Sequence, residues 1–191
     1  RKYLLYGEKI MLNFVFSILF FSILTICLTM ALTRHFKWDV AEILKFLAAA
    51  VTFIIFLTVL LFPLPLSQEE AGFASVNIIP FKTIAGYIIS AVRDGMVGTA
   101  LSQILGNVLL FFFFMSVLGW YMHLYSFRTY VIWLLIFAVM AEGMQAVVSL
   151  CLGYLYRSVD IDDVILYVIG GLLSYAWLGR YAKENNTSHK E

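Results

Sequence analysis

The chain has 191 residues, of which 62% are hydrophobic and 13% charged, and its mean hydropathy is +0.91. An ordinary soluble domain has about 45–50% apolar and about 25% charged residues, so this composition excludes a soluble globular protein. A formal net charge of +1 also excludes a nucleic-acid-binding protein, which needs clusters of Lys and Arg for phosphate groups. We therefore expect a membrane protein, with membrane lipids and no nucleic acid among its partners.

Several apolar stretches are long enough to cross a bilayer, which takes about 20 helical residues. Stretches such as 13–30 and 48–62 are apolar on every side, which favours helices over the alternating strands of a β-barrel. The sequence thus predicts an all-α fold, a polytopic membrane helix bundle with about five transmembrane helices. The predicted spans are residues 10–33, 43–62, 101–122, 130–152 and 163–181.

The chain divides into three predicted parts. They are an N-terminal transmembrane helix with its loop (1–42), a membrane domain (43–181) and a polar C-terminal tail (182–191). With five spans, the loops at 63–100 and 153–162 share one side of the membrane, which we interpret as the outer side. The Lys and Arg counts of the two sides are nearly equal and do not decide the orientation by themselves.

The loop at 63–100 is the one extended connection, and long connections often carry function. From Phe81 to Val92, apolar residues recur at spacings of three and four, which is typical of an amphipathic helix. Pro80 suits the first turn of this helix and Gly95 suits its end. We predict an interfacial amphipathic helix that lies at the membrane surface. A simple connector over the mouth of the bundle and a substrate-facing segment both remain open.

Polar residues interrupt the apolar stretches and need partners there. Glu142 falls near the middle of the fourth stretch, where an ionisable group costs about 2.5–3.5 kcal/mol on insertion scales. Gln145 lies on the same helical face, and Asn107 lies near the start of the third stretch. These residues either hold helices together, with Glu142 protonated or paired with Arg157, or they form a functional site.

Three acids and one Arg directly precede the fifth apolar stretch. If the helix begins at Arg157, then Arg157, Asp160 and Asp163 share one stripe and Asp162 points about 160° away, so Asp160 and Asp163 are the predicted pair. The acids either stabilise a helix N-terminus or, with waters, hold Mg²⁺ at the membrane boundary. The three His residues lie far apart in the chain, which gives a zinc site little support.

The remaining motifs exclude other classes of protein. The chain has no Gly-rich phosphate loop and no nucleophile-elbow motif, so a nucleotide-driven pump is not expected. Cys27 and Cys151 lie in apolar stretches without C-x-x-C spacing, and we expect two reduced, buried thiols.

Four motifs, in this order, resemble the VanZ-like family of bacterial membrane proteins. They are Asn77 with Pro80 and Phe81, Gly106-Asn107, Glu142-x-x-Gln145, and Arg157-x-x-Asp160-x-x-Asp163 followed by Gly170-Gly171. The resemblance covers about residues 77–171 and implies a multi-pass protein of the bacterial cell membrane. Two positions depart from the family pattern: Tyr167 stands where Asn is usual, and the stretch 111–114 lacks the Pro often found there.

The family's founding member is associated with resistance to teicoplanin, a lipid-bearing glycopeptide that binds peptidoglycan precursors outside the cell. The resemblance therefore implies a role in lipoglycopeptide tolerance. We expect the chain to bind an anionic lipid-linked or lipopeptide ligand at the outer leaflet, such as a lipid-linked cell-wall precursor or the lipoglycopeptide itself, without a cofactor. The candidate ligand-binding residues are Asn77, Asn107, Glu142, Gln145, Arg157, Asp160 and Asp163.

Two alternatives stay open, and with them the question of whether the chain is an enzyme. The first is a membrane enzyme acting on a polyprenyl or phospholipid head group, with Asp160 and Asp163 holding Mg²⁺ and Glu142 as acid or base. The second is a non-catalytic assembly partner without a ligand.

Overall fold

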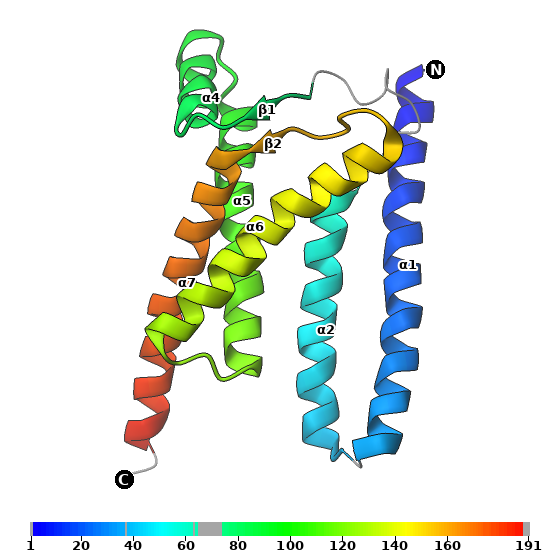
Figure 1. The fold of residues 1–191 in the computed structure, drawn as a ribbon, viewed down its shortest axis with the longest axis vertical. Coiled ribbons are helices and arrows are strands. Elements are labelled where there is room, and N and C mark those ends of the chain that lie inside the picture. The colour runs from blue at the N-terminus through cyan, green and yellow to red at the C-terminus, as the bar shows by residue number, and fades with distance from the viewer. Residues whose placement is uncertain (1, 37, 63, 65–73, 189–191) are drawn as a thin grey trace. The chain divides into compact units, whose positions relative to one another are not determined.

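The chain forms two compact units, Arg1–Leu66 and Ser67–Glu191, in a computed structural model (Figure 1). The structure describes residues 2–36, 38–62, 64 and 74–188, with side chains within 15–180 except those of residues 17, 32, 34 and 36. The regular structure is almost entirely helical, which confirms the predicted all-α fold.

The first unit is a helical hairpin of α1 (Lys2–Phe36) and α2 (Val40–Leu61), which run antiparallel (Figure 1). The turn ends at Asp39, whose carboxylate accepts a hydrogen bond of 2.8 Å from the N–H of Glu42. This bond pairs one of the free N–H groups at the start of α2, so Asp39 sets where the helix begins.

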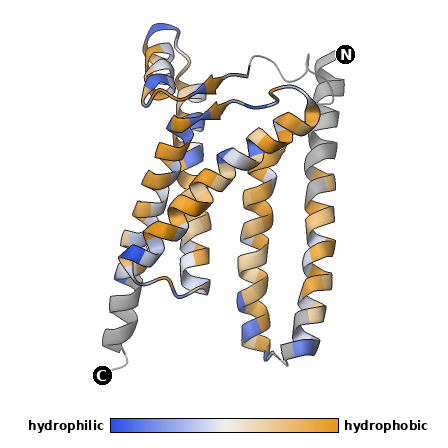
Figure 2. Ribbon diagram, viewed as in Figure 1, coloured by the Kyte–Doolittle hydropathy of each residue, from blue (hydrophilic) through white to orange (hydrophobic). Residues whose placement is uncertain are grey.

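Four helices are long and apolar enough to cross a membrane within the described part of the chain. They are α2, α5 (Val97–Tyr121), α6 (Phe127–Leu152) and the Ile161–Arg180 part of α7 (Ile161–Ser188). Each matches a predicted span to within a few residues, and hydrophobic colours dominate these helices in Figure 2. The chain is thus a multi-pass membrane protein.

The first predicted span and the predicted tail are only partly described. The described apolar segment of α1, Ile18–Ala31, is shorter than a membrane span, and part of the predicted stretch 10–33 lies outside the described side chains. The side chains of the predicted polar tail, 182–191, also lie outside the described residues. Four of the five predicted spans are therefore confirmed.

In the second unit α5 and α7 run side by side, and α6 packs obliquely against them (Figure 1). Two glycines of α7 permit this packing. A Cβ at Gly170 would lie 2.1 Å from the backbone oxygen of Val108, and a Cβ at Gly171 would lie 2.2 Å from the side chain of Leu134. Small residues at a helix interface let backbones approach closely, as in other membrane bundles.

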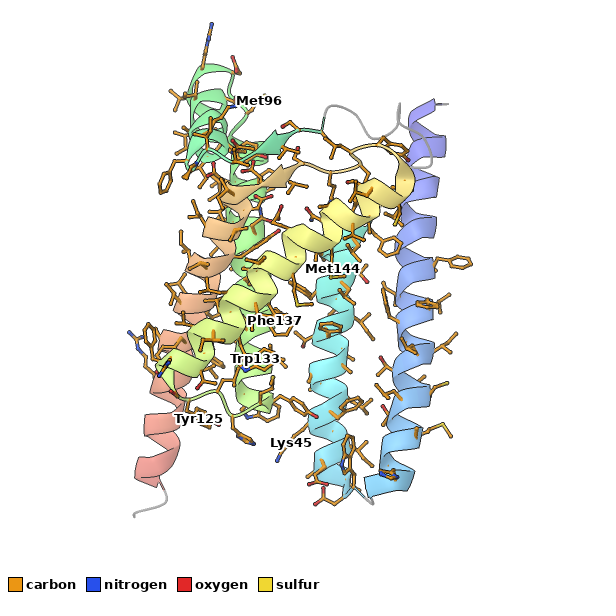
Figure 3. The ribbon with its side chains drawn as sticks, viewed as in Figure 1. Lys45, Met96, Tyr125, Trp133, Phe137 and Met144 are labelled. Atoms are coloured by element: carbon orange, nitrogen blue, oxygen red, sulfur yellow. The ribbon has the colours of Figure 1, made fainter. Side chains whose placement is uncertain are left out.

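The core between these helices combines paired polar groups with aromatic rings. The hydroxyl of buried Tyr130 donates a hydrogen bond of 2.8 Å to the Ser174 hydroxyl. The Ser174 hydroxyl also accepts a hydrogen bond of 2.9 Å from the Ser116 hydroxyl. Trp133 and Phe137 stack along α6 with ring centroids 5.9 Å apart (Figure 3). Because these three hydroxyl groups form hydrogen bonds with one another, their burial between the helices does not leave an unpaired polar group.

Two short strands join the loops at the other end of this unit. β1 (Val76–Asn77) pairs in parallel with β2 (Val159–Asp160), with Asn77 opposite Asp160. The loops before α5 and before α7 therefore lie on the same side of the bundle, as predicted.

Two sequence predictions about local structure are wrong. The segment from Arg157 to Asp160 is not helical, because Asp160 ends β2 and α7 begins at Ile161. The thiols of Cys27 and Cys151 are free but exposed on their helices rather than buried. A thiol behaves as a small apolar side chain, so its place in an apolar stretch does not require burial in the protein.

Replacing Gly170 by Ala should destabilise the second unit. The added Cβ cannot fit beside the Val108 backbone oxygen, so α5 and α7 must separate, at a cost of about 1–3 kcal/mol. Thermal unfolding of the purified protein should show a lower midpoint for G170A. G179A is the matched control, because a Cβ at Gly179 of the same helix meets no atom within 4 Å. Equal midpoints for the two variants would contradict the close approach.

Candidate functional site

The carboxylate of Asp162 caps the start of α4 (Lys82–Arg93) from a distant part of the chain. Its Oδ1 accepts a hydrogen bond from the N–H of Phe81 at 2.5 Å, and its Oδ2 accepts from the N–H groups of Thr83 and Ile84 at 2.7 and 3.0 Å. No side chain of α4 itself caps this end. Asp162, which is only 1% exposed, thus ties the start of α4 to the start of α7.

The backbone before α4 needs this support. Phe81 has φ of +65°, a left-handed conformation that costs an L-residue roughly 1–2 kcal/mol. The hydrogen bond from its N–H to Asp162 offsets that strain. Pro80 lies in the turn before α4 rather than in the predicted first helical turn, and Gly95, with φ of +70°, follows the helix end as predicted.

Asp160 joins β1, α4 and α6 through both its side chain and its backbone. Its Oδ1 accepts from the Asn77 amide at 2.8 Å and from the N–H of Asp162 at 2.9 Å, and its Oδ2 accepts from the Thr83 hydroxyl at 2.5 Å. Its own N–H donates to Glu142 Oε2 at 2.9 Å. Asp160 and Asp163, the predicted pair, interact electrostatically, and Asp160 also has Thr83 as a bonding partner in common with Asp162.

We call the linked polar residues at this end of the bundle the polar cluster: Asn77, Thr83, Asn107, Glu142, Tyr156, Asp160, Asp162 and Asp163. Two buried oxygen atoms of this cluster lack a hydrogen-bond partner among the described residues. They are Oε1 of Glu142 and the hydroxyl of Tyr156, whose residues are 6% and 4% exposed. An unpaired buried polar atom costs about 1–3 kcal/mol. Since both oxygens of Asp160 and of Asp162 accept hydrogen bonds, these two unpaired atoms need a separate explanation.

The other predicted residues lie around the same end of the bundle. Asn107 of α5 donates to Asp163 Oδ1 at 2.6 Å, which joins α5 to α7. Arg157 interacts electrostatically with Asp163, and Gln145 is buried one helical turn after Glu142. The bonded chain Asn77–Asp160–Glu142 and the bonded pair Asn107–Asp163 contain five of the seven predicted residues.

The two positions that depart from the family pattern meet in the structure. Tyr167 is buried and stacks on Phe111, with ring centroids 4.2 Å apart and an interplanar angle of 18°. Tyr167 also interacts electrostatically with Glu142 and Asp163. The Phe-rich stretch of α5 therefore supports one wall of the polar cluster.

A mostly apolar groove of about 480 Å³ lies beside the cluster, between the end of α6 and the paired strands. It contains Val76 of β1, Val159 of β2 and Ser149 of α6, and Ser149 Oγ accepts a hydrogen bond from the N–H of Tyr156 at 3.4 Å. The further lining residues are Ala146, Leu150, Gly153, Tyr154 and Leu155. The groove and the cluster thus share the segment that ends in β2.

Sequence reasoning missed three residues of this cluster, Asp162, Thr83 and Tyr156. A helix that starts at Arg157 turns Asp162 away from Asp160, but α7 begins only at Ile161, so that prediction does not hold for Asp162. The acids at the start of a helix did indicate a capping function, but the capped helix is α4 rather than α7. Nothing in the spacing of Thr83 or Tyr156 marks either residue.

The cluster does not match a metal centre. The described residues contain no group of three or more His, Cys, Asp or Glu that could hold a metal ion. Both oxygens of Asp160 already accept hydrogen bonds from N–H or O–H groups. Asp160 therefore has little capacity left for the Mg²⁺ that the enzyme alternative requires.

Two tyrosines outside the spanning helices report on the charge of the cluster. Burial, together with the nearby carboxylates of Asp163 and Asp160, raises the pKa of Tyr87 in α4. Burial also raises the pKa of Tyr156. Both hydroxyls consequently remain protonated, and able to donate hydrogen bonds, at neutral pH.

Removing the carboxylate of Asp162 should loosen the start of α4. In D162A the N–H groups of Phe81, Thr83 and Ile84 lose their acceptor, so their amide exchange should accelerate about tenfold or more, since a hydrogen bond to a charged group contributes about 1.5–3 kcal/mol. Hydrogen–deuterium exchange with peptide resolution measures this effect. D94N removes an exposed carboxylate at the other end of α4 and should leave this exchange unchanged. Unaltered exchange in D162A would disprove the cap.

Neutralising Asp163 should lower the pKa of Tyr87. The variant D163N removes a negative charge that disfavours the phenolate, so deprotonation of Tyr87 becomes easier and its titration moves to lower pH. Phenolate formation is followed by ultraviolet absorbance as the pH is raised. In each background, subtracting the absorbance of the Y87F variant from that of the protein with Tyr87 gives the titration of Tyr87 alone. D94N again serves as the control, and an unmoved titration in D163N would show that the carboxylate does not act on Tyr87.

One comparison with known proteins identifies the family of this chain. The family model described as VanZ/LLP1 matches residues 46–180, which include most of the second predicted span and every residue of the cluster. Searches of curated proteins and of solved structures found no match. The matched segment covers well over half of the chain, and the protein belongs to the VanZ/LLP1 family.

Proposed function

We propose that this membrane protein binds an anionic lipid-linked or lipopeptide ligand at the outer leaflet and thereby contributes to tolerance of teicoplanin-type lipoglycopeptides. The observation that carries the proposal is the pair of unpartnered buried oxygens, Glu142 Oε1 and the Tyr156 hydroxyl. A ligand that donates a hydrogen bond to the Glu142 carboxylate and accepts one from the Tyr156 hydroxyl would give both atoms the partners they lack. Membership of the VanZ/LLP1 family supports the same class of role.

The charges around these two atoms suit an anionic ligand with polar groups. Arg157 lies within electrostatic range of Tyr156 and Asp163, and a guanidinium pairs strongly with carboxylate or phosphate groups. Glu142 supplies the acceptor for a ligand hydroxyl or amide group. One ligand would therefore contact a cationic side chain, Arg157, and an anionic side chain, Glu142.

The groove beside the cluster suits the apolar part of such a ligand. Its volume of about 480 Å³ and its lining by Val76, Val159 and Leu155 match an acyl or prenyl chain. A ligand with a polar head and an apolar chain would therefore use the cluster and the groove together. A small hydrophilic ligand would leave the groove without a function.

Tyr156→Phe should abolish tolerance while leaving the protein folded. The variant removes a hydroxyl that makes no hydrogen bond within the described residues, so the stability of the protein should be equal or slightly greater. The minimum inhibitory concentration of teicoplanin is measured in cells with equal protein abundance, and E142Q should behave like Y156F. Y125F, which alters an exposed tyrosine next to His123, is the control and should keep wild-type tolerance. Full tolerance in Y156F and E142Q would overturn the proposal.

A binding measurement separates the candidate ligands. Purified protein in nanodiscs is titrated with teicoplanin, with its deacylated core and with a lipid-linked peptidoglycan precursor. We expect one of the two lipid-bearing compounds to bind, and Y156F to weaken that binding by about tenfold, the effect of one hydrogen bond to a charged or buried group. A dominant stoichiometric protein partner, with no binding of either compound, would favour the assembly alternative instead.

A further inference from the structure

Helix α4 presents an apolar surface away from the rest of its unit. None of its residues is buried, and Ile88, Ile89 and Val92 are 52%, 59% and 84% exposed. At about 100° per residue, these three side chains share one arc of about 100° with Ala85, and Phe81 directly precedes the helix. Phe81 and Ala85 are exposed as well, so the outward face of α4 is continuous and apolar.

The opposite face of α4 is already occupied. Thr83 and Ile84 are held by Asp162, and the Thr83 hydroxyl donates to Asp160. Tyr87, one turn later, is half-buried on the same side. Because these hydrogen bonds fix the rotation of the helix about its axis, the apolar arc cannot turn inward.

Exposed apolar residues follow α4 along the chain into the membrane span α5. Only residues 94–96 separate α4 from α5, and Met96 lies near this junction (Figure 3). Met96, Val97 and Leu101 are each about half exposed, so apolar side chains extend from the connection onto a helix that crosses the bilayer. A connection this short keeps α4 close to the bilayer surface.

Charged residues border the arc on one side. Lys82 and Arg93 are exposed and lie next to Ile89 on the helical wheel, and Figure 2 shows both hydrophobic and hydrophilic residues on α4. Cationic side chains beside an apolar face are typical of helices that lie in the head-group region of a membrane. Phosphate groups of anionic lipids attract such residues.

We propose that α4 binds the bilayer surface, with Phe81, Ile88, Ile89 and Val92 in the boundary between head groups and acyl chains and Lys82 and Arg93 on lipid phosphates. The occupant of the apolar face is the lipid bilayer itself. This contact is independent of the ligand proposed above, because it uses the outward face of α4, whereas the cluster lies on the inward side.

Spin labels on single cysteines test the depth of α4. In a background with Cys27 and Cys151 replaced by Ala, labels are placed at Ile88, at Val92 and, as the control, at Gly86, where a Cβ meets no atom within 4 Å. Collision rates with oxygen and with a water-soluble nickel reagent are measured in nanodiscs. We expect the oxygen-to-nickel ratio to be severalfold higher at Ile88 and Val92 than at Gly86.

Two results would overturn the proposal. One is equal access of the nickel reagent to all three labels, which would place the apolar face in water. The other is strong dipolar coupling between labels of two copies, which would mean that a second chain covers the face.

The charge contact has its own test. Anionic lipid should raise the oxygen-to-nickel ratio at Ile88 in the wild-type background but not in a variant with K82Q and R93Q. An equal effect of anionic lipid in both proteins would refute the contact with phosphates. Because none of these measurements includes a lipoglycopeptide, they remain decisive whether or not the proposed ligand binds.

Discussion

The polar end of the second unit depends on the carboxylate of Asp162. Near a bilayer, unpaired backbone N–H groups are costly, and α4 has no capping side chain of its own. Asp162 pairs the N–H groups of Phe81, Thr83 and Ile84, although it lies about eighty residues away along the chain. The loop before α5 and the start of α7 therefore acquire their structures together, and neither can be understood as a local element.

The acids near the start of α7 look alike in the sequence, but each has different hydrogen-bond partners in the structure. Asp162 holds α4, Asp160 bonds to Asn77 and Thr83, and Asp163 bonds to Asn107. Glu142 is oriented by the backbone N–H of Asp160, so its position depends on the strand pair. With these contacts made, Oε1 of Glu142 is the carboxylate oxygen that stays buried without a hydrogen-bond partner among the described residues.

The sequence predicted the helices well because bilayer thickness sets the length of an apolar span, so composition is enough to find α2, α5, α6 and α7. It also placed Asn77, Asn107, Glu142 and Asp160 at one end of the bundle. It failed for Asp162 because a helical period was extended back to Arg157, through a strand of two residues that periodicity cannot detect. The partners of Asp162 are backbone groups, which leave no pattern in the sequence.

The structure also explains how the chain tolerates Tyr167 where the family usually has Asn. An amide at this position would offer a short polar group, whereas the phenol carries its hydroxyl farther from the helix and requires space for a ring. Phe111 provides a flat apolar surface for that ring, with an interplanar angle of 18°, and it lies in the stretch that lacks the usual Pro. The hydroxyl of Tyr167 then interacts with Glu142. The two departures from the family pattern therefore contact each other beside Glu142.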